Sequence, residues 1–227
     1  MRGWTIAALA VVLNLQIGIG PAKAAEPVDL ALVLAVDCSF SVSEDEYHFQ
    51  LQAIADALRS KDVASEISSG SNGGIAVVMM EWAGEGEQKA ATPWTRLASA
   101  SDIEAYAEAL THAPRYETGY TSISGAIAGG LTLLTHAPFV AGRRVIDIST
   151  DGDNNDGPRP EVVRDRAARL GVTINGLAIT HNLPYLDLYF QHHVIAGPGS
   201  FVLKADDDAA FHAAMKRKLL LEIQPVS

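Results

Sequence analysis

The residues LALVLAVDCSFSVSEDE, 30 to 46, decide what kind of fold the chain adopts. Seven apolar residues, 30–36, are followed at once by Asp37, Ser39 and Ser41. An unbroken apolar run of this length is typical of a strand that is buried on both faces of a parallel sheet. A carboxylate and two hydroxyls at alternating positions beyond such a strand form either a turn into a helix or part of a site.

A helix is predicted directly after this stretch. Ser43 and Glu46 have the spacing of a capping box, in which each side chain binds the backbone N–H of the other residue. The apolar residues that follow recur at helical spacing and are expected to face the core: Tyr47, Leu51, Ile54, Ala55 and Leu58. The polar residues 65–74 are interpreted as a loop.

The rest of the chain alternates between strand-like and helical segments. Strands are predicted at 75–82, 144–149, 172–179 and 200–204, with a short antiparallel one at 91–94. Helices are predicted at 101–111, 121–135, 160–170, 185–193 and from 206 onward. This order predicts an α/β fold: a doubly wound, mostly parallel central sheet with one short antiparallel edge strand and helices on both faces. Residues 25–227 contain no repeat or linker and are expected to form a single domain.

Residues 1–24 have the pattern of a secretory signal peptide. Arg2 precedes an apolar core at 6–13, and Ala22-Lys23-Ala24 has the small residues of a cleavage site. The apolar segment is shorter than the roughly 20 residues that cross a bilayer, and no later segment is long and apolar enough. The sequence therefore predicts a periplasmic or extracellular protein without a membrane span.

Acidic residues dominate the charge of the chain. Removal of residues 1–24 takes away Arg2 and Lys23 but no acid, and so moves the formal charge from −10 to −12. Such a surface repels nucleic acid and anionic lipid, and it favours divalent cations or basic partners. Cys38 is the only cysteine, so no intramolecular disulfide can form, and its place in the strand predicts a buried, unreactive thiol.

Polar residues follow two of the predicted strands, at the edge where a parallel sheet binds its ligands. The run 144–149 is followed by Thr150 and Asp151, just as the first strand is followed by Asp37. Thr121 stands where a helix begins and can reach the same edge. Because carboxylates and hydroxyls are hard oxygen ligands that suit Mg²⁺, the opening stretch is interpreted as half of a metal site.

This set of residues resembles the metal-ion-dependent adhesion site (MIDAS) of von Willebrand factor type A (VWA) domains. Asp37-Cys-Ser39-Phe-Ser41 matches the first part of that motif, Thr121 the second and Asp151 the third. The resemblance covers about residues 28–222 and implies a VWA, Rossmann-like fold. It also implies direct metal contacts from the three hydroxyls, and direct or water-mediated contacts from the two carboxylates. The chain is similar, too, to secreted bacterial proteins made of little besides this domain.

The resemblance implies a secreted module, not an enzyme, that coordinates Mg²⁺ (or Mn²⁺ or Ca²⁺) and takes the acidic side chain of a protein ligand. Two alternatives stay open. One is a metal-assisted phosphoester hydrolase, because two carboxylates and a metal can support that chemistry. The other is a self-assembling structural domain that the metal only stabilises. The sequence indicates no oligomeric state.

Three further features have plainer interpretations. The loop that starts at Asp151 lacks the sixth-position glycine and twelfth-position glutamate of a calcium-binding EF-hand, so its acids are interpreted as solvated. His192-His193 lies near Asp187, but no His-Glu-x-x-His is present, which favours an ordinary helix end over a metal or acid–base cluster. Asp147 interrupts an apolar strand, and pairing with Arg143 or Arg144 is favoured over a place beneath the metal.

Export should leave a chain that starts at Ala25, with a start at Glu26 as an acceptable variant, because cleavage follows the Ala-x-Ala pattern. Intact-mass measurement of the protein recovered from the periplasm or the medium checks this expectation. An exported protein that still carries Met1 would contradict it.

Overall fold

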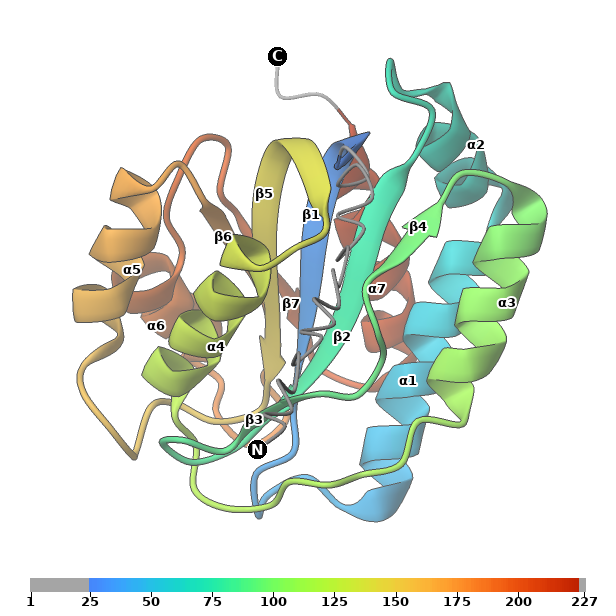
Figure 1. Ribbon diagram of the computed structural model, residues 1–227. Helices are drawn as coiled ribbons and strands as arrows, with labels where there is room; N and C mark the ends of the chain where they lie inside the picture. The colour runs from blue at the N-terminus through green and yellow to red at the C-terminus, as the bar shows by residue number, and fades with distance from the viewer. Residues whose placement is uncertain (1–24, 225–227) are drawn as a thin grey trace, which may run out of the picture.

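The computed structural model describes residues 25–224, in which a seven-stranded sheet lies between two layers of helices (Figure 1). The strand order is β3-β2-β1-β5-β6-β7, and β4 also pairs with β2. The strands are β1 (Glu26–Asp37), β2 (Ile75–Trp82), β3 (Gln88–Ala90), β4 (Thr95–Leu97), β5 (Phe139–Thr150), β6 (Thr173–Ile179) and β7 (Val202–Ala205). The helices are α1 (Glu44–Arg59), α2 (Lys61–Ser69), α3 (Ala100–Thr111), α4 (Ile123–Thr135), α5 (Pro160–Arg169), α6 (Leu186–Tyr189), the π-helix η1 (Phe190–Val194) and α7 (Asp208–Ile223).

The predicted fold class is confirmed, with one change at the edge of the sheet. The central pairs β1–β2, β1–β5, β5–β6 and β6–β7 are parallel. The predicted edge strand at 91–94 lies between two short strands, β3 and β4, which both pair antiparallel with β2. The strand breaks here because Pro93 has no N–H, and the Thr92 hydroxyl accepts a hydrogen bond from the Met79 N–H at 2.9 Å.

The predicted signal peptide, residues 1–24, lies outside the described part of the chain. Within residues 25–224, no helix has both the length and the apolar character that crossing a membrane requires.

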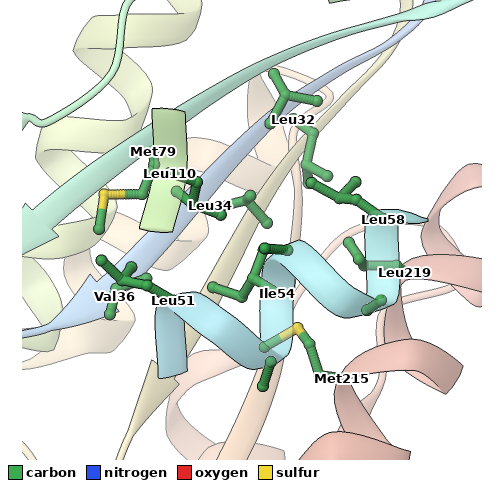
Figure 2. Close-up of a cluster of buried hydrophobic side chains, with 14 of the residues drawn as sticks. Leu32, Leu34, Val36, Leu51, Ile54, Leu58, Met79, Leu110, Met215 and Leu219 are labelled. Atoms are coloured by element: carbon green, nitrogen blue, oxygen red, sulfur yellow. The ribbon is translucent and has the colours of Figure 1, made fainter. Parts of the chain in front are cut away.

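The central strand β1 contributes to the core on both faces of the sheet. Its residues 30, 32, 34 and 36 face α1, α3 and α7, and residues 31, 33 and 35 face α4. Figure 2 shows the first of these layers, in which side chains of β1 meet those of α1 and α7: Leu32, Leu34, Val36, Leu51, Ile54, Leu58, Met215 and Leu219. Burial on both faces explains why the run is apolar throughout.

The glycine pair in α4 lets this helix lie close to the sheet. A Cβ atom on Gly130 would come within 2.8 Å of the Ile146 side chain, and one on Gly129 within 3.0 Å of Met80 Sδ. Each glycine lowers helix propensity by about 1 kcal/mol relative to alanine. Close packing of α4 against β5 and β2 explains why the sequence keeps them.

Helix starts follow capping rules, although not always at the predicted residue. In α1, the Glu46 N–H donates to Ser43 Oγ at 3.2 Å and the Ser43 N–H donates to Glu46 Oε2 at 2.7 Å, which confirms the capping box. The cap of α3 is Ser99, not Ser101 or Asp102, because Asp102 is the reciprocal partner of Ser99. The predicted loop 65–74 is wrong for residues 65–69, which belong to α2.

Asp147 pairs with a lysine of α7 and not with Arg143 or Arg144. The Lys218 ammonium contacts the Asp147 carboxylate and donates to Glu222 Oε1 at 2.9 Å. These three side chains are buried, with Lys218 fully enclosed. Arg143 instead donates to the backbone carbonyl of Glu222 at 2.8 Å. The buried charge is therefore paired, as expected, but its partner comes from a distant part of the sequence.

In this cluster two carboxylates share one ammonium. Burial raises the pKa of Glu222 above its ordinary value of 4.5, and the nearby Asp147 carboxylate raises it further. At a pH between the ordinary and the raised pKa, Glu222 holds a proton in the folded chain and has released it in the unfolded chain. Stability from this group is therefore lost as the pH rises through that interval.

Replacement of Lys218 by Met should lower the free energy of unfolding by about 3–5 kcal/mol, because two buried carboxylates lose their counter-charge. Glu222→Gln should be nearly neutral at low pH and more stable than the wild type at high pH. Urea unfolding at pH 5 and pH 8 measures both effects.

Lys216→Met is the matched control, because Lys216 lies in the same helix but pairs with Asp62 on the surface at 2.7 Å. Loss of that exposed pair should change stability by less than about 1 kcal/mol. Equal effects of the two lysine variants would contradict the assigned role of Lys218.

Candidate functional site

The carboxyl ends of β1 and β5 lie side by side at one edge of the sheet. Their parallel register pairs Val36 with Ser149, so that Asp37 and Thr150 follow at the same level. Asp151 is the next residue along the chain. The segment that precedes α4, with Thr121, meets the same edge, because its Thr121 carbonyl accepts the Asn155 N–H at 2.9 Å.

Asp37 is a fully buried carboxylate at the tip of the central strand. Its Oδ1 accepts the Ser39 N–H at 2.7 Å, and its Oδ2 accepts the Thr150 hydroxyl. Burial raises the pKa of Asp37 to about 6, and the nearby Asp151 charge adds to this rise. The two hydrogen bonds fix the direction of the carboxylate without neutralising it.

Ser39, Ser41 and Asp151 form a chain of hydrogen bonds from the interior to the surface. Ser39 Oγ lies 3.1 Å from Ser41 Oγ, and the Ser41 hydroxyl donates to Asp151 Oδ1 at 2.7 Å. Ser39 is buried, Asp151 is half-buried and Ser41 is exposed, so the site opens to solvent at Ser41. Burial also raises the pKa of Asp151.

Thr121 is buried and lies against the loop that follows β5. Its N–H donates to Asn155 Oδ1 at 2.8 Å, and its hydroxyl oxygen would be 3.3 Å from a Cβ atom placed on Gly152. Thr121 makes no hydrogen bond to the other four candidate residues in the described part of the chain. Hydrogen bonds thus connect Asp37, Ser39, Ser41 and Asp151, and packing brings Thr121 to the loop of Asp151.

Side chains of the loop after β5 accept hydrogen bonds from the backbone of neighbouring segments, a role that the sequence interpretation missed. Besides Asn155, Asn154 Oδ1 accepts the Ser124 N–H at 3.2 Å. Asp156 Oδ2 accepts the Glu85 N–H at 2.7 Å, so this acid is not merely solvated as predicted. The preference of asparagine and aspartate for binding nearby backbone in turns was the available signal.

A second buried acid, Glu81 at the end of β2, holds the segment that leads to Thr121. Its side chain accepts hydrogen bonds from the Tyr47 hydroxyl at 2.8 Å and from the Tyr116 N–H at 2.7 Å. Nothing in the apolar pattern of residues 75–82 identified Glu81 as a positioning residue.

Arg115 ties the same segment to the DxSxS turn. Its guanidinium donates to the carbonyl oxygens of Cys38 at 2.9 Å and Ser39 at 3.3 Å. Cys38 itself is fully buried, as predicted, and burial raises the pKa of its thiol. The thiol is therefore part of the packed core and not of the polar surface.

The two histidines predicted to end a helix lie at the end of η1. His193 Nδ1 lies 2.7 Å from Glu161 Oε1 of α5, so its partner is Glu161 and not Asp187. Within residues 25–224, no three His, Cys, Asp or Glu side chains are grouped so that they could hold a metal ion. A cation at the β1–β5 edge would therefore depend on hydroxyl ligands.

The donor set at this edge fits a hard divalent cation. Two carboxylates and three hydroxyls supply only oxygen, which suits Mg²⁺, Mn²⁺ or Ca²⁺ better than thiolate-seeking metals. The 3.1 Å between Ser39 Oγ and Ser41 Oγ matches the roughly 3 Å that separates adjacent ligands of an octahedral ion with bonds of about 2.1 Å.

The chain is similar to one protein family over nearly its whole described length. A family model described as "Protein of unknown function (DUF1194)" matches residues 27–227. The search of curated proteins found no match. Among solved structures, proximal thread matrix protein 1 (PTMP1) from the mussel byssus has a TM-score of 0.63 at 18% identity, covering 87% of this chain and 48% of that one.

Other similar structures have the same fold. A PTMP1 structure "with zinc occupied MIDAS motif" has a TM-score of 0.60 at 18% identity, with 87% and 48% of the two chains covered. The pilus adhesin SpaC from Lactobacillus rhamnosus GG has a TM-score of 0.61 at 16% identity, and the match covers 86% of this chain and 31% of that one. The von Willebrand factor type A protein from Catenulispora acidiphila has a TM-score of 0.55 at 14% identity, and the match covers 85% of this chain and 42% of that one. The chain thus has the VWA fold, and it spans half or less of each neighbour.

Thr150→Val should destabilise the chain by about 1.5–3 kcal/mol in the presence of a chelator, because the buried Asp37 carboxylate loses its hydroxyl donor and the Gly152 N–H loses its acceptor, without a change of shape. Ser149→Ala is the control, since the Ser149 hydroxyl makes only a long, 3.4 Å hydrogen bond to Gln50. Urea unfolding compares the two. If Thr150→Val costs no more than Ser149→Ala, Thr150 does not hold Asp37.

Proposed function

The chain belongs to the DUF1194 family, and from its VWA fold and site we propose that it is a secreted protein-binding module whose binding depends on a divalent cation. Five oxygen-donor residues of three chain segments meet at the carboxyl edge of the sheet, and this convergence carries the proposal. The cation would be held by Ser39, Ser41 and Thr121, with Asp37 and Asp151 acting directly or through water.

The charge of the site supports a resident cation. Asp37 and Asp151 have raised pKa values, chiefly because both carboxylates are shielded from water. In residues 25–224, neither forms an ion pair with a lysine or arginine side chain. A divalent cation would supply the missing positive charge and keep both carboxylates ionised near neutral pH. Mg²⁺ is the first choice, with Mn²⁺ and Ca²⁺ as alternatives.

The opening at Ser41 gives a partner access to that cation. When bound, the cation would offer a coordination position to an acidic side chain of a protein ligand. Residues behind the opening hold the ligands in position, since Thr150 orients Asp37, Asn155 orients Thr121, and Arg115 fixes the turn that contains Ser39. These contacts keep the ligand oxygens in place before a cation arrives.

The structural neighbours support an adhesion-type role outside the cytoplasm. PTMP1 is named as a matrix protein of the byssus and SpaC as a pilus adhesin. These names describe those proteins, and they favour a binding function for this chain over catalysis. The predicted signal peptide favours a location outside the cytoplasm. Two alternatives, a phosphoester hydrolase and a self-assembling domain, are tested on the same protein by phosphoester turnover and by light scattering, each with and without metal.

Asp151→Ala should abolish Mg²⁺ and Mn²⁺ binding in calorimetry while the circular dichroism spectrum stays the same. The change removes one of the two carboxylates at a strand end and opens no cavity in the core. Without metal, the variant should be at least as stable as the wild type, because Asp37 no longer faces a second carboxylate.

Asp153→Ala is the matched control, because it also removes a carboxylate from the loop after β5. The Asp153 carboxylate makes only a 3.5 Å contact, with the Tyr185 hydroxyl. This variant should bind metal like the wild type. Wild-type metal affinity in Asp151→Ala would show that Asp151 is no ligand. Failure of the metal-free variant to fold would assign Asp151 a structural role instead.

A further inference from the structure

A cleft of about 190 Å³ borders the candidate metal site, and Asp151 forms part of its wall. The other walls come from α1, from the end of β6 and the residues after it, and from the start of α7. Pockets for small-molecule ligands usually measure about 300–1,000 Å³. This cleft is therefore sized for a single side chain and not for a cofactor.

The interior of the cleft is apolar. Its apolar lining is Val42, Phe49, Ile179 and Phe211, of which Val42 and Phe211 are buried in the core, and His181 and Asn182 border it after β6. Surfaces of this kind accept the long aliphatic stem of a lysine or arginine while the charged group stays at the polar rim.

The rim of the cleft is acidic, and the fold uses only one oxygen of each acid. Glu46 accepts the Ser43 N–H through Oε2, Asp206 accepts the Thr180 hydroxyl through Oδ1, and Asp207 accepts the Ala210 N–H through Oδ1. In the described part of the chain, the second oxygen of each carboxylate has no hydrogen-bond partner. These bonds lower the pKa of Glu46 and of Asp206, and the Lys204 ammonium, 3.1 Å from Asp206 Oδ1, lowers the pKa of Asp206 further.

A buried amide inside the cleft is a separate indication of a ligand. Gln50 lines the cleft although only 3% of its surface is exposed. Its Oε1 accepts the Ser149 hydroxyl at 3.4 Å, and its Nε2 has no hydrogen-bond acceptor among the side-chain and backbone groups that the structure describes. Because the Ser149 hydroxyl can donate or accept, the Gln50 amide can turn either its oxygen or its nitrogen toward a guest.

We propose that this cleft binds a lysine or arginine side chain of the same partner whose carboxylate reaches the cation. The inference rests on the proposed function, because the cation site and the cleft share Asp151. A partner with acidic residues alone would approach a face that already carries Glu46, Asp206 and Asp207, of which Asp206 has a counter-charge in Lys204. A neighbouring basic side chain offsets that repulsion, and so the cleft selects for acidic residues that have a basic residue close by.

A phage-displayed library of random peptides, captured on the full chain with Mn²⁺ and eluted with EDTA, tests the preference directly. Peptides that elute should contain an Asp or Glu together with a Lys or Arg. One such peptide is then synthesised with its basic residue and with norleucine in that place, which keeps the aliphatic stem but removes the charge.

The double variant Glu46→Gln, Asp206→Asn removes two rim charges and keeps both local hydrogen bonds, because amide oxygens accept like carboxylates. The control is Asp56→Asn, Glu108→Gln, which removes two exposed charges of α1 and α3 that do not line the cleft. In fluorescence anisotropy, the rim variant should bind the basic peptide about fivefold more weakly, and the control within about twofold of the wild type.

Replacement of the basic residue of the peptide by norleucine should weaken its binding to the wild type but not to the rim variant. This difference would place the basic residue beside Glu46 and Asp206. EDTA-eluted peptides with acidic residues but no excess of Lys or Arg would overturn the cleft proposal alone. Equal loss in the rim and control variants would do the same. Absence of any metal-dependent capture would overturn both the cleft proposal and the proposed function.

Discussion

The parallel register between β1 and β5 is the constraint on which the site depends. It sets Val36 beside Ser149, so that the Asp37 carboxylate meets the Thr150 hydroxyl and Asp151 follows at the rim. A slip of one residue would turn Asp37 to the opposite face of the sheet. The slip is prevented by packing, because β1 has apolar side chains on both faces and each set fits its own layer of helices. The chemistry at the edge thus depends on the packing of the centre.

Two groups of largely buried acids differ in what balances their negative charge. Between β5 and α7, Asp147 and Glu222 both contact the ammonium of Lys218, a counter-charge that the chain supplies itself. At the sheet edge, within the described residues, Asp37 and Asp151 receive only hydrogen bonds from hydroxyl and N–H groups. The first group thus has a cation from the chain itself, although Asp147 Oδ2 and Glu222 Oε2 have no hydrogen-bond partner among the described residues. The second leaves a negative charge that a divalent cation would balance, and this difference supports the proposed metal site.

Much of this arrangement could be predicted from local sequence. The run 30–36 indicated a buried strand, and the spacing of Ser43 and Glu46 indicated the start of α1, because both signals involve neighbours in the chain. The order of the VWA motif brought Thr121 to the same edge as Asp37. The lysine partner of Asp147 was missed because Lys218 lies far along the sequence and only the packing of α7 brings it close. Asn155 and Arg115 were missed for the same reason, since loop-to-loop hydrogen bonds leave no periodic pattern.

The VWA fold does not by itself fix a function, because one fold carries many kinds of site. The central claim is that a single cation is held jointly by the turn after β1, the start of α4 and the loop after β5. A crystal structure of the chain grown with Mn²⁺, with anomalous scattering recorded for the metal, tests this claim directly. We expect one strong peak within roughly 2.0–2.5 Å of the hydroxyl oxygens of Ser39, Ser41 and Thr121. A peak at Asp153 or Asp156, or no peak at saturating Mn²⁺, would contradict it.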